Sequence, residues 1–473
     1  MFAPSTVPAS AIALQDSSLE LTYGQLKKLT TTLPPRSVVL LVAPTTTAAA
    51  AAILTCLREQ VVAIHSSNNN SAAVLAQLAH NYQVDAIIAP ADVLTELKKI
   101  CTFTHTSTLV GDFTVAKLPE HHRVPVYEHL ALLLPTSGST GSSKYVRISY
   151  ENLTQHAATI ADYLHLRPQE RPLLSLPLFY SYGVSILLSH IHVGATVVLT
   201  PSSVMQAEYW HFLKDKDITS ISGVPYSYAM LLRLGLTRQT YPHLTAMTQA
   251  GGHLPAFQQQ ALATYAQKHG IRFYVMYGQT EATARISYLE PDMAARKLGS
   301  MGKAIAHGEL YLVNDKQERI TTPHEEGELI YKGPNVALGY AFKAEDLALG
   351  DEWQGVLHTG DVAYFDEDGY FFITGRLKRF IKLTGQRTSL TSVEDILSQQ
   401  YPQLVLAAGG SDDHLKVYIT QDSLQESGVT TSDVLMFLHH RLSVHPSLME
   451  VKAIEQMPLN DMSKISYKKL EEL

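Results

Sequence analysis

The most constraining feature of the sequence is a loop rich in glycine and serine, Thr136–Lys144, which lies between two apolar runs. Leu132–Leu134 before the loop and Tyr145–Ile148 after it have the continuous or alternating apolar pattern of buried strands. The sequence therefore predicts a strand–loop–strand hairpin. A Walker A loop would instead open a helix and would place Ser or Thr directly after its lysine, whereas Tyr145 follows Lys144.

The residue types of this loop are those of an anion-binding loop. Gly138 and Gly141 can adopt positive φ, which lets successive backbone N–H groups converge on one anion. The hydroxyl groups add donors, and Lys144 adds a positive charge. A flexible linker is the alternative, but the flanking strands and the terminal lysine favour a polyphosphate-binding loop. Its candidate binding residues are Thr136, Ser137, Gly138, Ser139, Thr140, Gly141 and Lys144.

Composition limits the class of protein. With 473 residues the chain is too long for one ordinary core, and 45% hydrophobic with 17% charged residues is typical of compact globular domains. The net charge of −7 and the absence of a basic run argue against nucleic acid as a partner. The two cysteines, Cys56 and Cys101, form neither a metal-binding spacing nor a disulfide framework, which fits a reducing compartment. We therefore expect a cytoplasmic protein without a secretory signal. Pro44 interrupts the most apolar stretch, so we expect no membrane span.

The order of strand-like and helical patterns predicts an α/β fold. Strand-like runs and helical stretches alternate to about residue 130, and again from Leu173 to about residue 280, which is typical of doubly wound sheets. Residues 310–375 read as short strands joined by Gly/Asp turns. We expect a large N-terminal domain, residues 1–377, with two doubly wound α/β subdomains and a small β-rich subdomain. A small α+β C-terminal domain, residues 378–473, follows it.

Several short motifs follow the loop in a fixed order. They are Gln249–Leu254, Tyr277–Glu281, Gly327-Glu-Leu, Gly339-Tyr340, His358–Asp361, Gly375-Arg376, Phe380–Gly385 and Pro458–Ile465. Each is weak alone, but their order and spacing over nearly the whole chain are specific. Together they resemble the adenylate-forming superfamily of acyl-CoA synthetases, adenylation domains of peptide synthetases and beetle luciferases. The second motif continued to Arg285, as Tyr277–Arg285, is most similar to stand-alone bacterial acid–thiol ligases.

The resemblance implies a two-step reaction that uses ATP and Mg²⁺. A carboxylate attacks the α-phosphate of ATP, which gives an acyl-adenylate and pyrophosphate. A thiol, either CoA or the phosphopantetheine of a separate carrier protein, then displaces AMP. The resemblance also implies that the C-terminal domain is mobile and that Lys378 is its hinge, since that domain rotates between the two steps.

The resemblance also assigns roles to individual residues. Lys464 would bridge the attacking carboxylate and the α-phosphate, Thr280 would contact that phosphate, and Glu281 would help hold Mg²⁺. These three are the candidate catalytic residues, and Glu281 is the candidate metal ligand. The remaining candidate nucleotide-binding residues are Gly252, His253 and Tyr277 near the adenine, Asp361 and Arg376 at the ribose, and Gly278.

The acid-binding segment departs from the amino-acid-activating relatives. Those relatives generally carry Phe-Asp where this chain has Phe179-Tyr180, and a buried ammonium without a carboxylate would be costly, so an α-amino acid is disfavoured. Aromatic residues here indicate an apolar or aromatic acid, although they fit an ordinary core equally well. The candidate substrate-binding residues are Tyr180, Tyr182, Gly223, Tyr226 and Gly251. Two further segments depart from the family pattern. The glycine-rich loop ends in Ser143-Lys144-Tyr145, where the family usually has Pro-Lys-Gly. The hinge has Lys378-Arg379, where the family often has an acidic pair.

Three alternatives remain open at this point. The chain could load an amino or aryl acid onto a separate carrier protein, since we expect no fused carrier domain. It could bind nucleotide without catalysis, although Thr280, Glu281, Asp361, Arg376 and Lys464 argue against this. It could also be a monooxygenase similar to the luciferases, which would share adenylation but consume oxygen.

Overall fold

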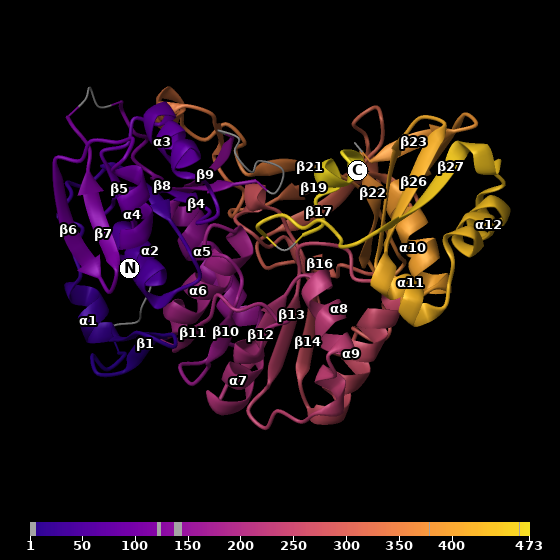
Figure 1. The fold of residues 1–473 in the computed structure, drawn as a ribbon, viewed down its shortest axis with the longest axis horizontal. Coiled ribbons are helices and arrows are strands. Elements are labelled where there is room, and N and C mark those ends of the chain that lie inside the picture. The colour runs from indigo at the N-terminus through magenta and orange to yellow at the C-terminus, as the bar shows by residue number, and fades with distance from the viewer. Residues whose placement is uncertain (1–5, 121–123, 137–143, 378, 463) are drawn as a thin grey trace.

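The computed structural model describes residues 6–120, 124–136, 144–377, 379–462 and 464–473. Two large mixed sheets and a smaller antiparallel sheet make up the N-terminal part, and the C-terminal residues form a separate lobe beside them (Figure 1). The predicted α/β class and the division into a large and a small part are confirmed. Lys378, the predicted hinge, lies outside the described residues, so the exact domain boundary stays a prediction.

The first large sheet has eight strands in the order β20-β9-β8-β4-β3-β5-β7-β6. Its centre is parallel, as predicted, while both edges are antiparallel. The predicted hairpin is present, since Leu134 on β8 lies opposite Val146 on β9. The strands are β3 (Val38–Val42), β4 (Val62–Ser66), β5 (Ala86–Pro90), β6 (His105–Val110), β7 (Phe113–Lys117), β8 (Leu130–Pro135), β9 (Tyr145–Ser149) and β20 (Gly339–Ala341).

The second large sheet has nine strands in the order β16-β15-β14-β13-β12-β10-β11-β1-β2. Its centre is again parallel, with two antiparallel pairs at the β16 edge and one at the β2 edge. The strands are β1 (Ile12–Gln15), β2 (Glu20–Thr22), β10 (Pro172–Leu174), β11 (Val197–Leu199), β12 (Ser220–Gly223), β13 (Ala246–Gln249), β14 (Arg272–Tyr277), β15 (Ser287–Leu289) and β16 (Lys303–Ala304).

Helices bury the faces of these sheets. α2 is alanine-rich and contacts strands of both sheets, which explains why it is apolar on every side. Ser149 caps α5 through a capping box, and α5 packs on α6. The helices of this part are α1 (Tyr23–Lys28), α2 (Thr47–Arg58), α3 (Ala72–Asn81), α4 (Ala91–Leu97), α5 (Tyr150–Tyr163), α6 (Ser181–Val193), α7 (Ala207–Asp215), α8 (Pro225–Arg233) and α9 (Ala256–His269).

The predicted β-rich subdomain is a five-stranded antiparallel sheet in the order β18-β17-β19-β21-β22. It lies between the two large sheets and the C-terminal lobe (Figure 1). Its strands are β17 (Glu309–Val313), β18 (Arg319–Ile320), β19 (Gly327–Lys332), β21 (Val356–Phe365) and β22 (Phe371–Arg376).

The C-terminal lobe contains a two-stranded hairpin and a three-stranded sheet with their own apolar core. The yellow end of the chain leaves this lobe and runs back toward the middle of the molecule (Figure 1), so it brings the last motif toward the N-terminal part. The elements are β23 (Phe380–Leu383), β24 (Gln386–Ser389), α10 (Leu390–Gln400), β25 (Leu406–Ser411), β26 (His414–Thr420), α11 (Gln421–Ser427), α12 (Thr431–Leu442), β27 (Met449–Ile454) and α13 (Tyr467–Glu471).

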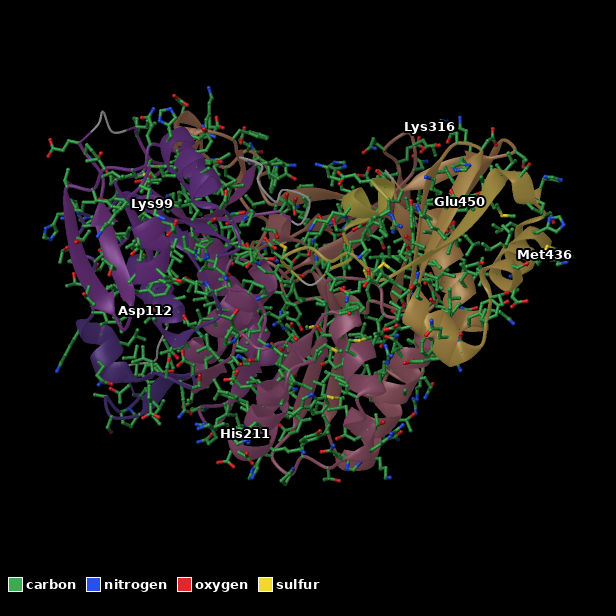
Figure 2. All side chains as sticks on the ribbon, in the orientation of Figure 1. Lys99, Asp112, His211, Lys316, Met436 and Glu450 are labelled. Atoms are coloured by element: carbon green, nitrogen blue, oxygen red, sulfur yellow. The ribbon has the colours of Figure 1, made fainter. Side chains whose placement is uncertain are left out.

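The outer surface carries dispersed polar side chains. The residues labelled in Figure 2 are all exposed and lie on the outside of both parts: Lys99, Asp112, His211, Lys316, Met436 and Glu450. Within the described ranges, no helix is both long and apolar enough to cross a membrane.

Candidate active site

A buried carboxylate, Asp361, lies where β14, β21 and β22 meet. Arg376 is directly opposite Asp361 in the β21–β22 ladder, and its Nε lies 2.9 Å from Asp361 Oδ1. The other carboxylate oxygen accepts hydrogen bonds from the Tyr277 hydroxyl and from Gln279 Nε2, the latter at 2.8 Å. The antiparallel register thus brings two neighbouring motifs together, and the Tyr277 hydrogen bond adds a third motif that lies 84 residues before Asp361.

Lys464 approaches this group from the C-terminal lobe. A tight turn positions it: the Asn460 side chain accepts from the Lys464 backbone N–H at 3.0 Å, and Leu459 pairs with Ile465. Burial and the positive charge of Arg376 lower the pKa of Lys464 to about 8, although Glu281 and Asp361 act in the opposite direction. The ammonium therefore lies among the groups that the motifs predict.

Thr280 and Glu281 form a short 3-10 turn, Thr280–Ala282, directly after β14. The Thr280 hydroxyl is 3.1 Å from the Ser181 hydroxyl at the start of α6, and the Tyr340 hydroxyl donates to Glu281 Oε1 at 2.9 Å. Lys144 Nζ stands 3.7 Å from the centre of the Tyr340 ring. Tyr340 therefore links the last residue of the glycine-rich loop to Glu281.

The predicted acid-binding wall lies beside Lys464. Lys464 Nζ is 4.8 Å from the centre of the Tyr180 ring, which meets the Tyr182 ring edge to face at 6.1 Å. Gly251 has φ of +89°, and a Cβ there would lie 2.5 Å from the Tyr180 hydroxyl oxygen and 3.1 Å from Lys464 Cε. Only glycine permits this conformation and this approach.

The predicted residues differ in how closely the structure brings them together. One group lies together at the Asp361 carboxylate, along the Tyr340 link and on the Tyr180 wall. Its members are Lys144, Tyr180, Tyr182, Gly251, Tyr277, Thr280, Glu281, Asp361, Arg376 and Lys464. A Cβ on Gly278 would lie 1.6 Å from the Ala284 carbonyl oxygen, so this glycine permits the chain crossing after β14. Ser137, Gly138, Ser139, Thr140 and Gly141 lie outside the described residues, and Thr136 directly follows β8.

Three predicted residues have local packing roles. Gly223 ends β12 beside Tyr228, Gly252 lies against Pro225, and Tyr226 is half-buried in α8. Their roles toward substrate or adenine stay predictions.

His253 makes a contact between the two parts of the chain that the sequence did not predict. Its Nε2 is 2.9 Å from Asp395 Oδ1 on α10. Burial opposes the charged imidazole, but the Asp395 carboxylate outweighs it and raises the pKa of His253. The sequence also missed Gln279, Tyr340 and Asn460; all three stand inside the quoted motifs, but only cross-strand and turn geometry reveals their contacts.

Comparison with known proteins identifies the family. Residues 7–341 match the family described as AMP-binding enzyme. The chain belongs to the AMP-binding enzymes. It is 31% identical over 351 residues to the 2-succinylbenzoate–CoA ligase of Bacillus cereus, an alignment that covers 73% of this chain and 70% of that relative.

Solved structures share the fold of this AMP-binding enzyme. O-succinylbenzoate CoA synthetase (MenE) from Bacillus subtilis in complex with ATP and magnesium superposes with a TM-score of 0.78 at 22% identity, over 98% of this chain and 96% of that one. ATP-bound MatB from Rhodopseudomonas palustris superposes with a TM-score of 0.81 at 19% identity, over 99% and 96%. Both similarities extend through the C-terminal lobe.

Proposed function

We propose that this AMP-binding enzyme is an AMP-forming acid–CoA ligase. The observation that carries the proposal is the position of Lys464, between the Asp361–Arg376 pair and the Tyr180–Gly251 wall. In the first step a carboxylate oxygen of the acid bonds to the α-phosphorus of ATP, and the bond to the pyrophosphate breaks. In the second step the CoA sulfur bonds to the acyl carbon, and AMP leaves.

The residues provide complementary charge for the first step. Two anions must meet, and the Lys464 ammonium between them would offset their repulsion, most strongly as charge develops in the transition state. Both Asp361 carboxylate oxygens already accept from neighbouring donors, and their remaining lone pairs would accept the ribose hydroxyls, with Arg376 alongside. The hydroxyl of Thr280 would donate to the α-phosphate. These roles are assigned from position and from the family pattern.

Glu281 is suited to a divalent cation held mainly by phosphates. The described residues contain no group of three or more His, Cys, Asp or Glu that could hold a metal alone. Mg²⁺ prefers oxygen ligands and commonly binds through one or two carboxylates with substrate phosphates, and Tyr340 fixes the Glu281 carboxylate for this purpose. Bound Mg²⁺ would neutralise phosphate charge during the first step.

The experiment that tests the function is pyrophosphate release from ATP with a panel of carboxylic acids, first without a thiol and then with CoA. The panel includes 2-succinylbenzoate, the acid in the name of the Bacillus cereus relative, together with benzoate, 4-oxo-4-phenylbutanoate and an amino acid. Release that depends on the acid and increases with CoA supports the proposal. Acid-dependent release that CoA does not increase would favour a separate carrier protein, and no release with any acid would overturn catalysis.

The pH dependence of the first step tests the charge of Lys464. We expect kcat/KM for ATP, which reports the free enzyme, to fall as pH rises above about 8, since Lys464 loses its proton there. A lysine with the usual side-chain pKa would give the same fall in kcat/KM more than two pH units higher. In the Lys464→Arg variant the remaining activity should show no such fall, because arginine keeps its proton throughout this range. The same fall in both proteins would assign it to another group.

Replacing Glu281 with glutamine is expected to raise the Mg²⁺ concentration for half-maximal pyrophosphate release by about tenfold or more. Glutamine keeps an oxygen for the Tyr340 hydroxyl and removes only the charge that would hold the cation. The measurement is initial rate against free Mg²⁺, with the exposed Glu326→Gln variant as the matched control. An unchanged Mg²⁺ dependence would contradict the metal role of Glu281.

A further inference from the structure

Two polar side chains, Thr248 and Gln249, end the parallel strand β13, and they point to opposite faces of the second large sheet. Thr248 points toward α6, since its Oγ1 is 2.8 Å from the Tyr182 hydroxyl and 2.8 Å from Ser222 Oγ. The Thr248 hydroxyl is therefore satisfied, on the face of the sheet that carries the acid-binding wall. Gln249 is left for the other face.

The Gln249 side chain is fully buried, but only one end of its carboxamide is used. Its Nε2 donates to the Gly252 carbonyl oxygen at 3.0 Å, across the turn that follows β13. Its Oε1 is buried and accepts no hydrogen bond within the described part of the chain. Exchanging the two ends of the amide would set two acceptors against each other at Gly252, so Oε1 is the free end. A buried acceptor without a donor is costly, which points to a ligand that supplies the donor.

The free oxygen of Gln249 lies on the side of the sheet that carries the predicted nucleotide-binding residues. Gln249 is opposite Val275 in the parallel β13–β14 ladder, and side chains paired in this way point to the same face. Tyr277, two residues after Val275, shares that face, and its hydroxyl meets Asp361, the candidate ribose acceptor. Gln249 therefore faces the nucleotide side of the site, whereas Thr248 faces the acid side.

The side chains next to Gln249 on this face are apolar. Met247 precedes it by two residues on β13, and Val275 lies opposite it; both belong to a buried cluster that contains residues of α8 and α9. The Gln249 carboxamide is thus a polar group at the end of an apolar cluster, where the parallel strand β13 finishes. Ligands of open α/β sheets bind beyond the carboxyl ends of the strands, so a bound ligand can supply the missing donor there.

We propose that Gln249 is the residue that selects the base of the nucleotide, with its Oε1 accepting a hydrogen bond from the exocyclic amine of adenine. The inference rests on the proposed function, because ATP must occupy this edge of the sheet, and it adds the residue that determines base specificity. Guanine and hypoxanthine carry an acceptor oxygen where adenine carries the amine. Oε1 would therefore attract adenine and repel the two oxygen-bearing purines.

Gln249 also holds the Gly251–Gly252 turn, and the two roles use different atoms. Its Nε2 holds the Gly252 carbonyl without any nucleotide present. Gly251 has a positive φ and approaches Tyr180 and Lys464 closely, so a displaced turn would impair the binding of every nucleotide alike. Base selection by Oε1 predicts instead an effect that depends on the group at the amine position of the purine. Nucleotides that differ only at that position therefore separate the two roles.

The test is calorimetric titration of the unaltered chain and of Gln249→Met with three nucleotides in the presence of Mg²⁺. They are ATP, purine riboside triphosphate, which has only hydrogen in place of the amine, and ITP, which has an oxygen there. For the unaltered chain we expect Kd to be about tenfold higher for the purine riboside nucleotide than for ATP, and higher still for ITP. In Gln249→Met, whose side chain has a similar length but no acceptor oxygen, both ratios should fall to within about threefold of unity, mainly through weaker binding of ATP.

Controls separate the outcomes. Gln260→Met, which replaces an exposed glutamine on α9, should leave all three Kd values unchanged. Unchanged ratios in Gln249→Met, or equal weakening of all three nucleotides, would overturn base selection and leave Gln249 with the turn alone. If the variant does not fold, the unaltered chain decides: purine riboside triphosphate that binds as tightly as ATP overturns the inference and leaves the ligase function intact. Binding of none of the three nucleotides would instead overturn the nucleotide site on which the proposed function depends.

Discussion

Replacement of Lys464 by alanine is expected to lower the rate of acyl-adenylate formation by about 100- to 1000-fold, while ATP binding changes by less than about threefold. The ammonium stands beside the acid-binding wall and the Asp361–Arg376 pair, where it would stabilise charge that develops as the acid attacks ATP. The ribose and the remaining phosphates would keep their other partners. Single-turnover adenylate formation and calorimetric titration with ATP measure the two quantities.

The second half-reaction provides an internal control for this variant. Supplied with chemically prepared acyl-adenylate, Lys464→Ala should still form the CoA thioester, because that step does not join two anions. Lys468→Ala, which removes an exposed lysine four residues further on, should behave as the unaltered chain does. Adenylate formation by Lys464→Ala at the parent rate, or equal loss of both half-reactions, would contradict the assigned role.

Contacts between the two parts of the chain explain how Lys464 reaches the site. His253 pairs with Asp395, Asn69 donates to Asp461 at 3.2 Å, and Arg233 pairs with Glu426. Apolar contacts accompany these polar ones, since Met462 belongs to a buried core cluster of the N-terminal part and Val405 packs against another. These contacts hold Lys464 beside the candidate site, and they would have to separate in the rotation of the C-terminal domain that the family resemblance implies.

The sequence predicted the fold well where local patterns decide it. The apolar runs Leu132–Leu134 and Tyr145–Ile148, for example, mark their strands directly. Strand partners at the sheet edges could not be predicted, because pairing depends on contacts that are distant in sequence. β1, for example, follows the N-terminus but pairs in parallel with β11, nearly two hundred residues later.

The candidate site, too, could be predicted from the sequence only where a local motif marks its residues. The family motifs supplied Asp361, Arg376 and Lys464, and the structure places them together. Gln249 stands at the start of a motif that was used only for its resemblance, and no sequence pattern distinguishes a buried glutamine with all its hydrogen bonds made from one with a free oxygen. That oxygen becomes visible only when the neighbours of Gln249 on β14 and in the turn after β13 are known.

The second large effect is expected at Asp361. Asp361→Asn should raise KM for ATP by about 30- to 100-fold, because it removes the carboxylate charge that pairs with Arg376 and one acceptor for the Tyr277 and Gln279 donors. In the proposed reaction the same carboxylate accepts the ribose hydroxyls, so binding of the nucleotide should suffer more than the chemical step. Steady-state rates at varied ATP, with calorimetric titration of ATP and of inorganic pyrophosphate, measure this.

The comparison of the two ligands makes the Asp361 prediction specific. Pyrophosphate lacks a ribose, so its binding should change by less than about threefold in Asp361→Asn, whereas general damage to the site would weaken both ligands. Asp315→Asn, on the exposed turn between β17 and β18, is the matched control for loss of one carboxylate. Unchanged KM for ATP, or equal weakening of ATP and pyrophosphate, would remove Asp361 from the nucleotide site and leave its pairing with Arg376 as a purely structural contact.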